Sequence, residues 1–78
     1  MDRHTFPTDL LKSQEAWYVT YQHLADVPTS GAAAHRRRLL QLSRLIAAHP
    51  YWQTPYGTPA ARVALKEQAR AQAAKARP

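Results

Sequence analysis

The stretch from Ser30 to His49 reads SGAAAHRRRLLQLSRLIAAH and holds the densest aliphatic pattern and the densest positive charge in the chain. Its apolar residues recur every three or four positions, which is the spacing of one face of an α-helix. That face contains Ala32, His35, Leu39, Leu42, Ile46 and His49. Leu45 and Leu40 widen it on either side, so the stretch predicts a helix over residues 30–49 that touches two neighbours.

The residues before this stretch predict another helix, over residues 9–27. Its periodic positions are Leu10, Gln14, Trp17, Tyr21 and Leu24. The short connection around Pro28 makes the two helices antiparallel neighbours, so a two-helix hairpin is expected. Large rings pack well against branched aliphatic side chains. We therefore expect the hairpin core to combine two sets of residues, namely Leu39, Leu42 and Ile46 with Trp17, Tyr21 and Leu24.

Residues 1–8 precede the first periodic segment and are expected to form a flexible arm, from which Phe6 can pack onto the domain. Short polar side chains at the helix starts predict N-caps. These are Thr8 or Asp9 for the first helix, Thr29 or Ser30 for the second, and Thr58 for a third. Pro50 ends the second helix, because proline lacks the backbone N–H that a helix interior requires.

Residues 50–58 are expected to form a loop rich in proline and aromatic residues, with Thr54–Gly57 suited to a type I turn. Residues 59–77 are rich in alanine, the best helix former, and predict the third helix. Its apolar stripe is weak and consists of Ala61, Leu65, Ala69, Gln72 and Ala76. The sequence therefore predicts one small all-α domain over residues 1–78: an antiparallel two-helix hairpin plus a weakly packed, Ala-rich C-terminal helix.

The composition argues against several classes of protein. The chain has no cysteine, no signal-peptide core and no apolar run near the roughly 18 residues that span a membrane, so a cytoplasmic protein is expected. The four histidines are too far apart in sequence for a common zinc motif, and no metal site is expected. No nucleophile motif or glycine-rich phosphate loop appears. We therefore expect a protein that is not an enzyme and takes no cofactor.

Positive charge is concentrated in the second part of the chain. Residues 29–78 hold nine Lys or Arg against Glu67 alone, a net charge of +8, whereas residues 1–28 carry −2. Such asymmetry is typical of a protein with an acidic partner, most commonly nucleic acid, although a simple solvated surface has a similar composition. The candidate phosphate contacts are Arg37, Arg44, Arg36, Arg38, Arg62, Lys66 and Arg70, with Lys75 and Arg77 further along.

Tyr51, Trp52 and Tyr56 in the loop have two interpretations. They can stack on bases beside the arginines, as in proteins that bind single strands, or they can plug the open end of the hairpin. The leading functional hypothesis is a small regulatory or accessory protein that contacts nucleic-acid phosphates regardless of base sequence, through the second and third helices. The alternative is a protein-interaction module whose hairpin forms a homodimer or docks on a larger protein partner.

Overall fold

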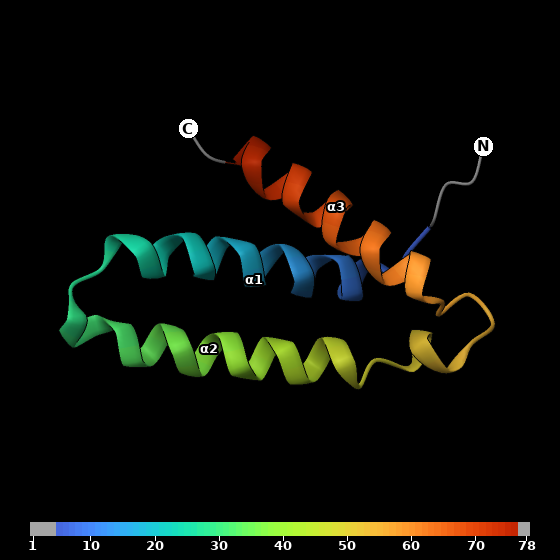
Figure 1. Cartoon of the computed structure of the whole chain (residues 1–78), viewed down its shortest axis with the longest axis horizontal. Helices are drawn as coiled ribbons and strands as arrows, with labels where there is room; N and C mark the ends of the chain where they lie inside the picture. Colours follow the sequence, from blue (N-terminus) through green and yellow to red (C-terminus); the bar gives the residue numbers. More distant parts are fainter. Residues whose placement is uncertain (1–4, 77–78) are drawn as a thin grey trace.

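The computed structural model describes residues 5–76, which form three α-helices and one short 3-10 helix (Figure 1). Helix α1 spans Thr8–Asp26, α2 spans Thr29–Ala47, η1 spans Pro50–Gln53 and α3 spans Pro59–Ala76. These elements confirm the all-α fold, with α1 and α2 as an antiparallel hairpin and a third, Ala-rich helix. Every α-helix end lies within two residues of its predicted position. Residues 1–4 of the expected arm, and Arg77, lie outside the described residues.

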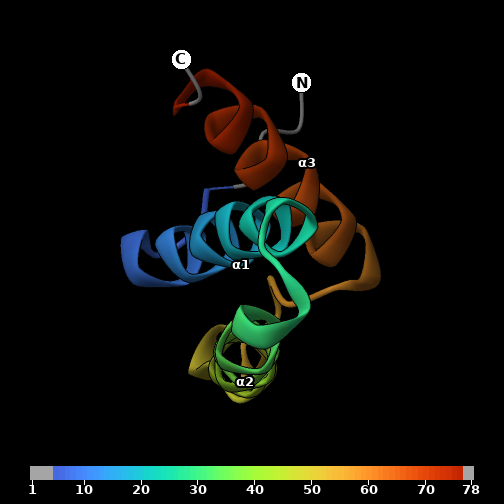
Figure 2. The same ribbon diagram turned by 90° about the vertical axis from the view of Figure 1, so that its left-hand side faces the viewer.

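The central helix of the fold is α1, which packs against both α2 and α3 (Figure 2). The sequence predicted instead that α2 would be the helix with two neighbours. The difference follows from the flanks of α2, where Leu40 and Leu45 stay 51% and 58% exposed beside exposed arginines. On α1, by contrast, Leu10 and Gln14 are buried, and the aromatic residues broaden the surface available for packing.

The main hydrophobic cluster lies where the start of α1 meets the start of α3, at the open end of the hairpin. It contains Phe6, Leu10, Ala61 and Leu65, and the partly buried side chains packed against it are Leu11, Ile46, Tyr51, Trp52 and Ala64. Phe6 is only 9% exposed, which confirms the expectation that it packs onto the domain from the N-terminal arm. A large aromatic ring beside Leu10 removes more apolar surface from water than an unpacked arm would.

The hairpin interface differs in part from the predicted one. Leu42 is 2% exposed, and Leu39 and Ile46 are half-buried, as expected for the contact face of α2. Tyr21, however, is 55% exposed and does not belong to the core. Because α1 is covered on two sides by different helices, part of its aromatic stripe faces the space between them instead of the α2 interface.

The three helices begin in different ways. Proline precedes α1 and α2 at Pro7 and Pro28, and neither helix start has a side-chain cap, so the predicted caps at Thr8 or Asp9 and at Thr29 or Ser30 are wrong. A proline with its φ fixed near −60° and an extended ψ leads directly into the first helical residue. The predicted cap of α3 is confirmed, because the backbone N–H of Ala61 donates to Oγ1 of Thr58 at 3.1 Å.

The contact between α3 and α1 is made mainly by alanines. Four α3 residues at four-residue spacing are at most 1% exposed: Ala61, Leu65, Ala69 and Ala73. The predicted stripe placed Gln72 where Ala73 is buried, and Gln72 is exposed. A row of residues four apart is inclined to the helix axis, so α3 crosses α1 obliquely (Figure 1). Leu65 is the only large side chain in this row, which agrees with the expected weak packing.

Candidate functional site

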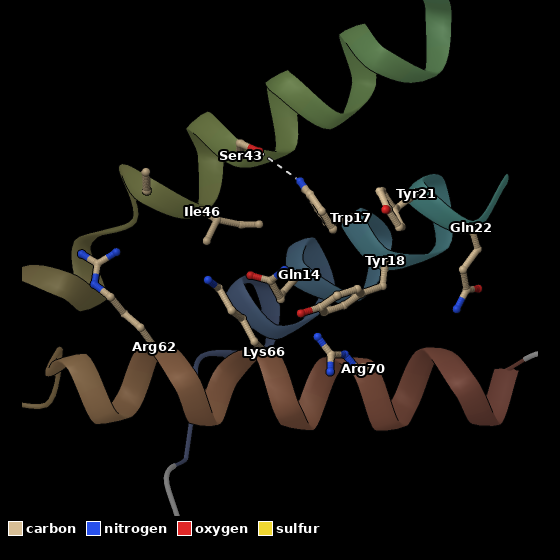
Figure 3. Close-up of a pocket in the computed structure, with 11 residues that line it drawn as sticks. Gln14, Trp17, Tyr18, Tyr21, Gln22, Ser43, Ile46, Arg62, Lys66 and Arg70 are labelled. Carbon is tan, nitrogen blue, oxygen red and sulfur yellow. Dashed lines mark hydrogen bonds between the residues drawn. The ribbon is translucent and has the colours of Figure 1, made fainter. Parts of the chain in front are cut away.

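A groove of about 780 Å³ opens where α2 and α3 flank α1 (Figure 3). Helix α1 forms its floor, and the other two helices form its walls. The α2 wall is small and mainly apolar, whereas the α3 wall is basic. The lining residues are Gln14, Trp17, Tyr18, Tyr21 and Gln22 from α1, Ser43, Ile46 and Ala47 from α2, and Arg62, Lys66 and Arg70 from α3.

The floor of the groove is aromatic. Trp17 and Tyr21 are stacked almost in parallel, with ring centroids 5.4 Å apart and planes 9° apart, and Tyr18 meets the edge of Trp17 at 5.4 Å. The indole N–H of Trp17 donates to Oγ of Ser43 at 3.0 Å, which ties the floor to the α2 wall (Figure 3). This bond orients the Trp17 ring, and through the stack it orients Tyr21, which is 55% exposed.

The α3 wall carries three cations at four-residue spacing, which places them about 6 Å apart along the helix axis. Arg62 lies over the ring of Trp52 at 4.4 Å and Arg70 over the ring of Tyr18 at 5.4 Å, both cation–π contacts. Lys66 lies between them. Within residues 5–76 none of the three forms an ion pair, so their mutual repulsion is not relieved by a carboxylate.

The arginines of α2 form a different surface. Arg36, Arg37, Arg38 and Arg44 are all exposed, and none of them lines the groove. Arg37 and Arg44 lie on the side of α2 that faces away from Leu42 and α1, about 10 Å apart along the axis. The structure thus separates the predicted basic site into two parts: the α3 row (Arg62, Lys66 and Arg70) at the groove, and the α2 pair (Arg37 and Arg44) on the outer face.

The loop aromatics mostly serve as a plug. Tyr51 packs against Phe6 with centroids 5.4 Å apart, and the Trp52 indole donates to the carbonyl of Ile46 at 2.6 Å. Both rings are partly buried against the core, so they are not available as open stacking surfaces. Tyr56 differs, because it is 71% exposed on the turn before α3.

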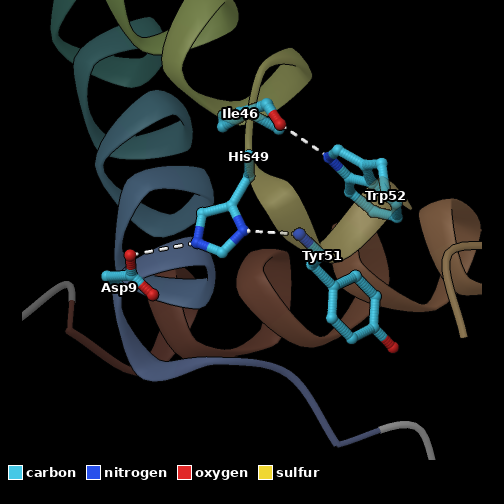
Figure 4. Close-up of polar contacts among 5 residues, drawn as sticks. All are labelled: Asp9, Ile46, His49, Tyr51 and Trp52. Atoms are coloured by element: carbon cyan, nitrogen blue, oxygen red, sulfur yellow. Dashed lines mark hydrogen bonds and ion pairs between the residues drawn. The ribbon is translucent and has the colours of Figure 1, made fainter. Parts of the chain in front are cut away.

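A hydrogen-bonded chain closes the same end of the molecule (Figure 4). The backbone N–H of Tyr51 donates to Nδ1 of His49 at 3.1 Å, and Nε2 of His49 donates to Oδ2 of Asp9 at 3.0 Å. Since Nδ1 accepts a bond, the ring proton lies on Nε2. The bond from His49 lowers the pKa of the Asp9 carboxyl below its usual value. This chain joins the start of α1 to the end of α2.

Sequence reasoning missed the functional potential of Trp17, Tyr18 and Tyr21, which it assigned to the hairpin core or its margin. The available signal was the width of this aromatic stripe, which exceeds what one aliphatic partner helix covers. Among residues 5–76, no group of three or more His, Asp or Glu side chains is placed to hold a metal ion. None of the helices in this part of the chain has the length and apolar character needed to cross a membrane.

The fold and the groove together define a class: a small three-helix protein with an aromatic-floored groove and a basic wall. A family model described as a domain of unknown function, DUF8825, matches residues 9–68, which make up most of the chain. The protein therefore belongs to this family. Comparison with curated proteins and with solved structures gave no match. The matched residues run from the start of α1 into α3 and include Arg62 and Lys66 of the groove wall.

Proposed function

We propose that this protein is a small, non-enzymatic accessory or regulatory protein of the cytoplasm that binds nucleic acid through the basic faces of α2 and α3. The observation that carries the proposal is the α3 row beside the groove. Arg62, Lys66 and Arg70 repeat every four residues and form no ion pair within the described chain. An anionic ligand along this row relieves the repulsion among them.

Phosphate fits these residues better than a single carboxylate does. The guanidinium of arginine donates hydrogen bonds in pairs that match two phosphate oxygens, and two of the three groove cations are arginines. A polymer with regularly repeated negative charges can contact several members of the row at once. The outer α2 pair, Arg37 and Arg44, adds a second set of phosphate contacts, and the charge of +8 over residues 29–78 steers an anionic polymer toward both surfaces.

A fluorescence-anisotropy titration at several salt concentrations tests this function, with a mixed-sequence duplex and a mixed-sequence single strand as ligands. With about five phosphate contacts, the log–log salt slope for the duplex is expected to be near −4 to −5. The double substitution Arg37→Ala and Arg44→Ala is expected to reduce the slope by about two units. The melting temperature is expected to change little, because both side chains are exposed.

The matched control is the double substitution Lys12→Gln and Lys75→Gln. It removes the same net charge from exposed positions outside the groove and outside α2. We expect the control to reduce the slope less than the α2 double variant does. Absence of binding to DNA and RNA at low salt would refute the proposed function, and equal effects of the two double variants would refute the α2 site.

A second candidate function is protein interaction, and the exposed leucines of α2 favour it. Leu40 is 51% exposed and Leu45 58% exposed, on the two flanks of the face that carries Arg37 and Arg44. Large apolar side chains beside arginines are typical of the centre of a protein interface. Such an interface joins two copies of the hairpin or docks the chain on a larger protein. Because its affinity comes mainly from apolar contacts, that affinity does not depend strongly on salt concentration.

A further inference from the structure

We infer that the groove binds single-stranded nucleic acid, with one base stacked on the exposed ring of Tyr21 and the adjoining phosphates along Arg62, Lys66 and Arg70. This inference rests on the proposed nucleic-acid binding and specifies the form of the strand and the residue that holds the base. The juxtaposition that carries it is an exposed ring on α1 opposite a row of cations on α3 that form no ion pair among residues 5–76 (Figure 3).

The ring of Tyr21 is held in place by its neighbours and is exposed enough to stack on a base. One face of its ring is covered by Trp17, 5.4 Å away and inclined by 9°, while 55% of the residue remains exposed. The Trp17 indole is itself held by Ser43 through a 3.0 Å hydrogen bond. A base that stacks on Tyr21 therefore extends an existing stack and does not have to order a mobile ring. Little conformational freedom is lost on binding.

The two walls of the groove differ in charge, and this difference determines which side of a bound strand faces each wall. Phosphates are drawn to the α3 wall, where the three cations are exposed. The opposite wall consists of Ser43, Ile46 and Ala47 and carries no charge. Bases therefore turn toward the aromatic floor and the apolar wall, away from the cations. A basic track beside an aromatic surface is the arrangement that proteins use to bind single strands with little sequence preference.

A duplex does not satisfy this site. In a double helix each base is covered on both faces by its neighbours, so none is free to stack on Tyr21. The groove volume of about 780 Å³ lies within the range of roughly 300–1,000 Å³ that encloses a small ligand. That space admits one splayed base with its sugar and phosphate, and it excludes a double helix. The phosphates of a duplex can reach the exposed cations of α2 and α3, but a duplex places no base in the groove.

The experiment compares the Kd of a mixed-sequence single strand with that of the duplex of the same length, at one low salt concentration. The variants are Tyr21→Leu, which removes the ring, and Tyr21→Phe, which keeps it. Tyr21→Leu is expected to raise the Kd for the single strand about 5- to 150-fold, the range for loss of one base–aromatic stack. The Kd for the duplex is expected to stay unchanged. Tyr21→Phe is expected to bind both ligands like the unmodified protein.

Two further variants complete the design. Val63→Ala removes an exposed side chain, 56% exposed and outside the groove, and is expected to leave both Kd values unchanged. Lys66→Gln is expected to reduce the salt slope for the single strand by about 0.7, one phosphate contact, whereas Lys12→Gln, at an exposed position of α1 outside the groove, is expected to leave it unchanged. A thermal melt of Tyr21→Leu that stays cooperative shows that a weaker Kd reflects the lost ring and not unfolding.

The outcomes separate this inference from the proposed function. Duplex and single strand bound equally, with no effect of Tyr21→Leu, would overturn the inference and leave the proposed function intact. No binding to either ligand at low salt would overturn both. Binding of poly-glutamate that depends on Lys66 and matches the affinity for the single strand would also overturn the inference, because it would assign the groove to an acidic polypeptide.

Discussion

At the scale of single residues, Gly57 is required by a close approach of two backbone segments. A Cβ at this position would lie 2.6 Å from Cα of Trp52 and 2.9 Å from its carbonyl carbon and oxygen. Backbone atoms cannot rotate away, so Gly57→Ala forces the loop before α3 to shift. We expect Gly57→Ala to lower the free energy of unfolding by about 1–3 kcal/mol, as overpacking typically does.

Gly31 provides the matched control for this prediction. It lies in the first turns of α2, and an added Cβ there meets only Cβ of Val27 at 3.8 Å, which is ordinary contact. Since alanine favours a helix over glycine by about 1 kcal/mol, Gly31→Ala is expected to raise the melting temperature. Thermal melts of the two variants should move in opposite directions, and a shift of both in the same direction would contradict the packing described at Gly57.

Asp9 predicts a pH dependence of stability. The hydrogen bond from His49 lowers the pKa of this carboxyl from 3.8, so the folded state favours the carboxylate. The resulting stabilisation is fully present above pH values near 3.8 and is lost as the pH falls through the lowered pKa of the folded state. We expect Asp9→Asn to melt at a lower temperature than the unmodified protein at pH 6, and the difference to vanish at lower pH.

Asp26→Asn serves as the control, because Asp26 is exposed and forms no ion pair within residues 5–76. A series of melts from pH 2 to pH 6 compares the three proteins. The Asp9 carboxylate is 76% exposed, so its contribution should also decrease when salt is added. If Asp9→Asn and Asp26→Asn gave the same pH profile, the bond to His49 would have no role in stability.

At the scale of the helices, the α2 surface divides into a face that stabilises the hairpin and flanks that do not. Leu42 is 2% exposed on the side toward α1, whereas Leu45, three residues later, is 58% exposed. Leu42→Ala is expected to cost about 2–5 kcal/mol, because it removes buried methyl groups and leaves a cavity. Leu45→Ala is expected to change the free energy of unfolding by less than about 0.5 kcal/mol.

Chemical denaturation of both variants measures this difference directly, since each replaces leucine with alanine in the same helix. Equal midpoints for Leu42→Ala and Leu45→Ala would contradict the placement of α2 against α1. A large loss at Leu42 is a substantial fraction of the stability of a 78-residue domain, because such domains are only marginally stable.

At the scale of the whole molecule, the flat shape leaves surface for a partner. The described residues extend over 43 × 27 × 18 Å, and the outer flanks of α2 keep Leu40 and Leu45 exposed. As the alternative to phosphate binding by Arg37 and Arg44 on the same face, we predict that the chain forms a homodimer through α2. Its charge of +6, and the arginines on this helix, oppose self-association, so the dimer is expected to strengthen as salt screens the charges.

Light scattering at a protein concentration of about 100 μM, at low and at high salt, tests this prediction. A dimer with a Kd of about 100 μM has a binding free energy of about −5.5 kcal/mol. The double substitution Leu40→Gln and Leu45→Gln is expected to give a monomer without a loss of melting temperature, because both side chains are exposed. A mass of 8.8 kDa for the unmodified protein at both salt concentrations would rule the dimer out.

The sequence by itself determined the number and approximate limits of the three α-helices, whereas the segment that forms η1 was predicted as part of a loop. Periodic apolar residues, abundant alanine and well-placed prolines are local signals, and they act through backbone geometry that neighbouring residues alone dictate. The cap at Thr58 and the burial of Leu42 were predictable for the same reason. The plugging of the hairpin by Tyr51 and Trp52 was one of two interpretations that the sequence left open.

Only the tertiary structure decided which helix lies at the centre and which residues meet at the groove. Packing of the alanine row of α3 on α1 buries Phe6 in the core and places Tyr21 in the same groove as Arg62, Lys66 and Arg70. A weak stripe of small side chains does not stand out as an apolar pattern in the sequence, yet it allows two helices to pack closely. The angle at which they pack depends on contacts between residues distant in the chain. The same docking separates the α3 row from Arg37 and Arg44, because α1 lies between the helices that carry them.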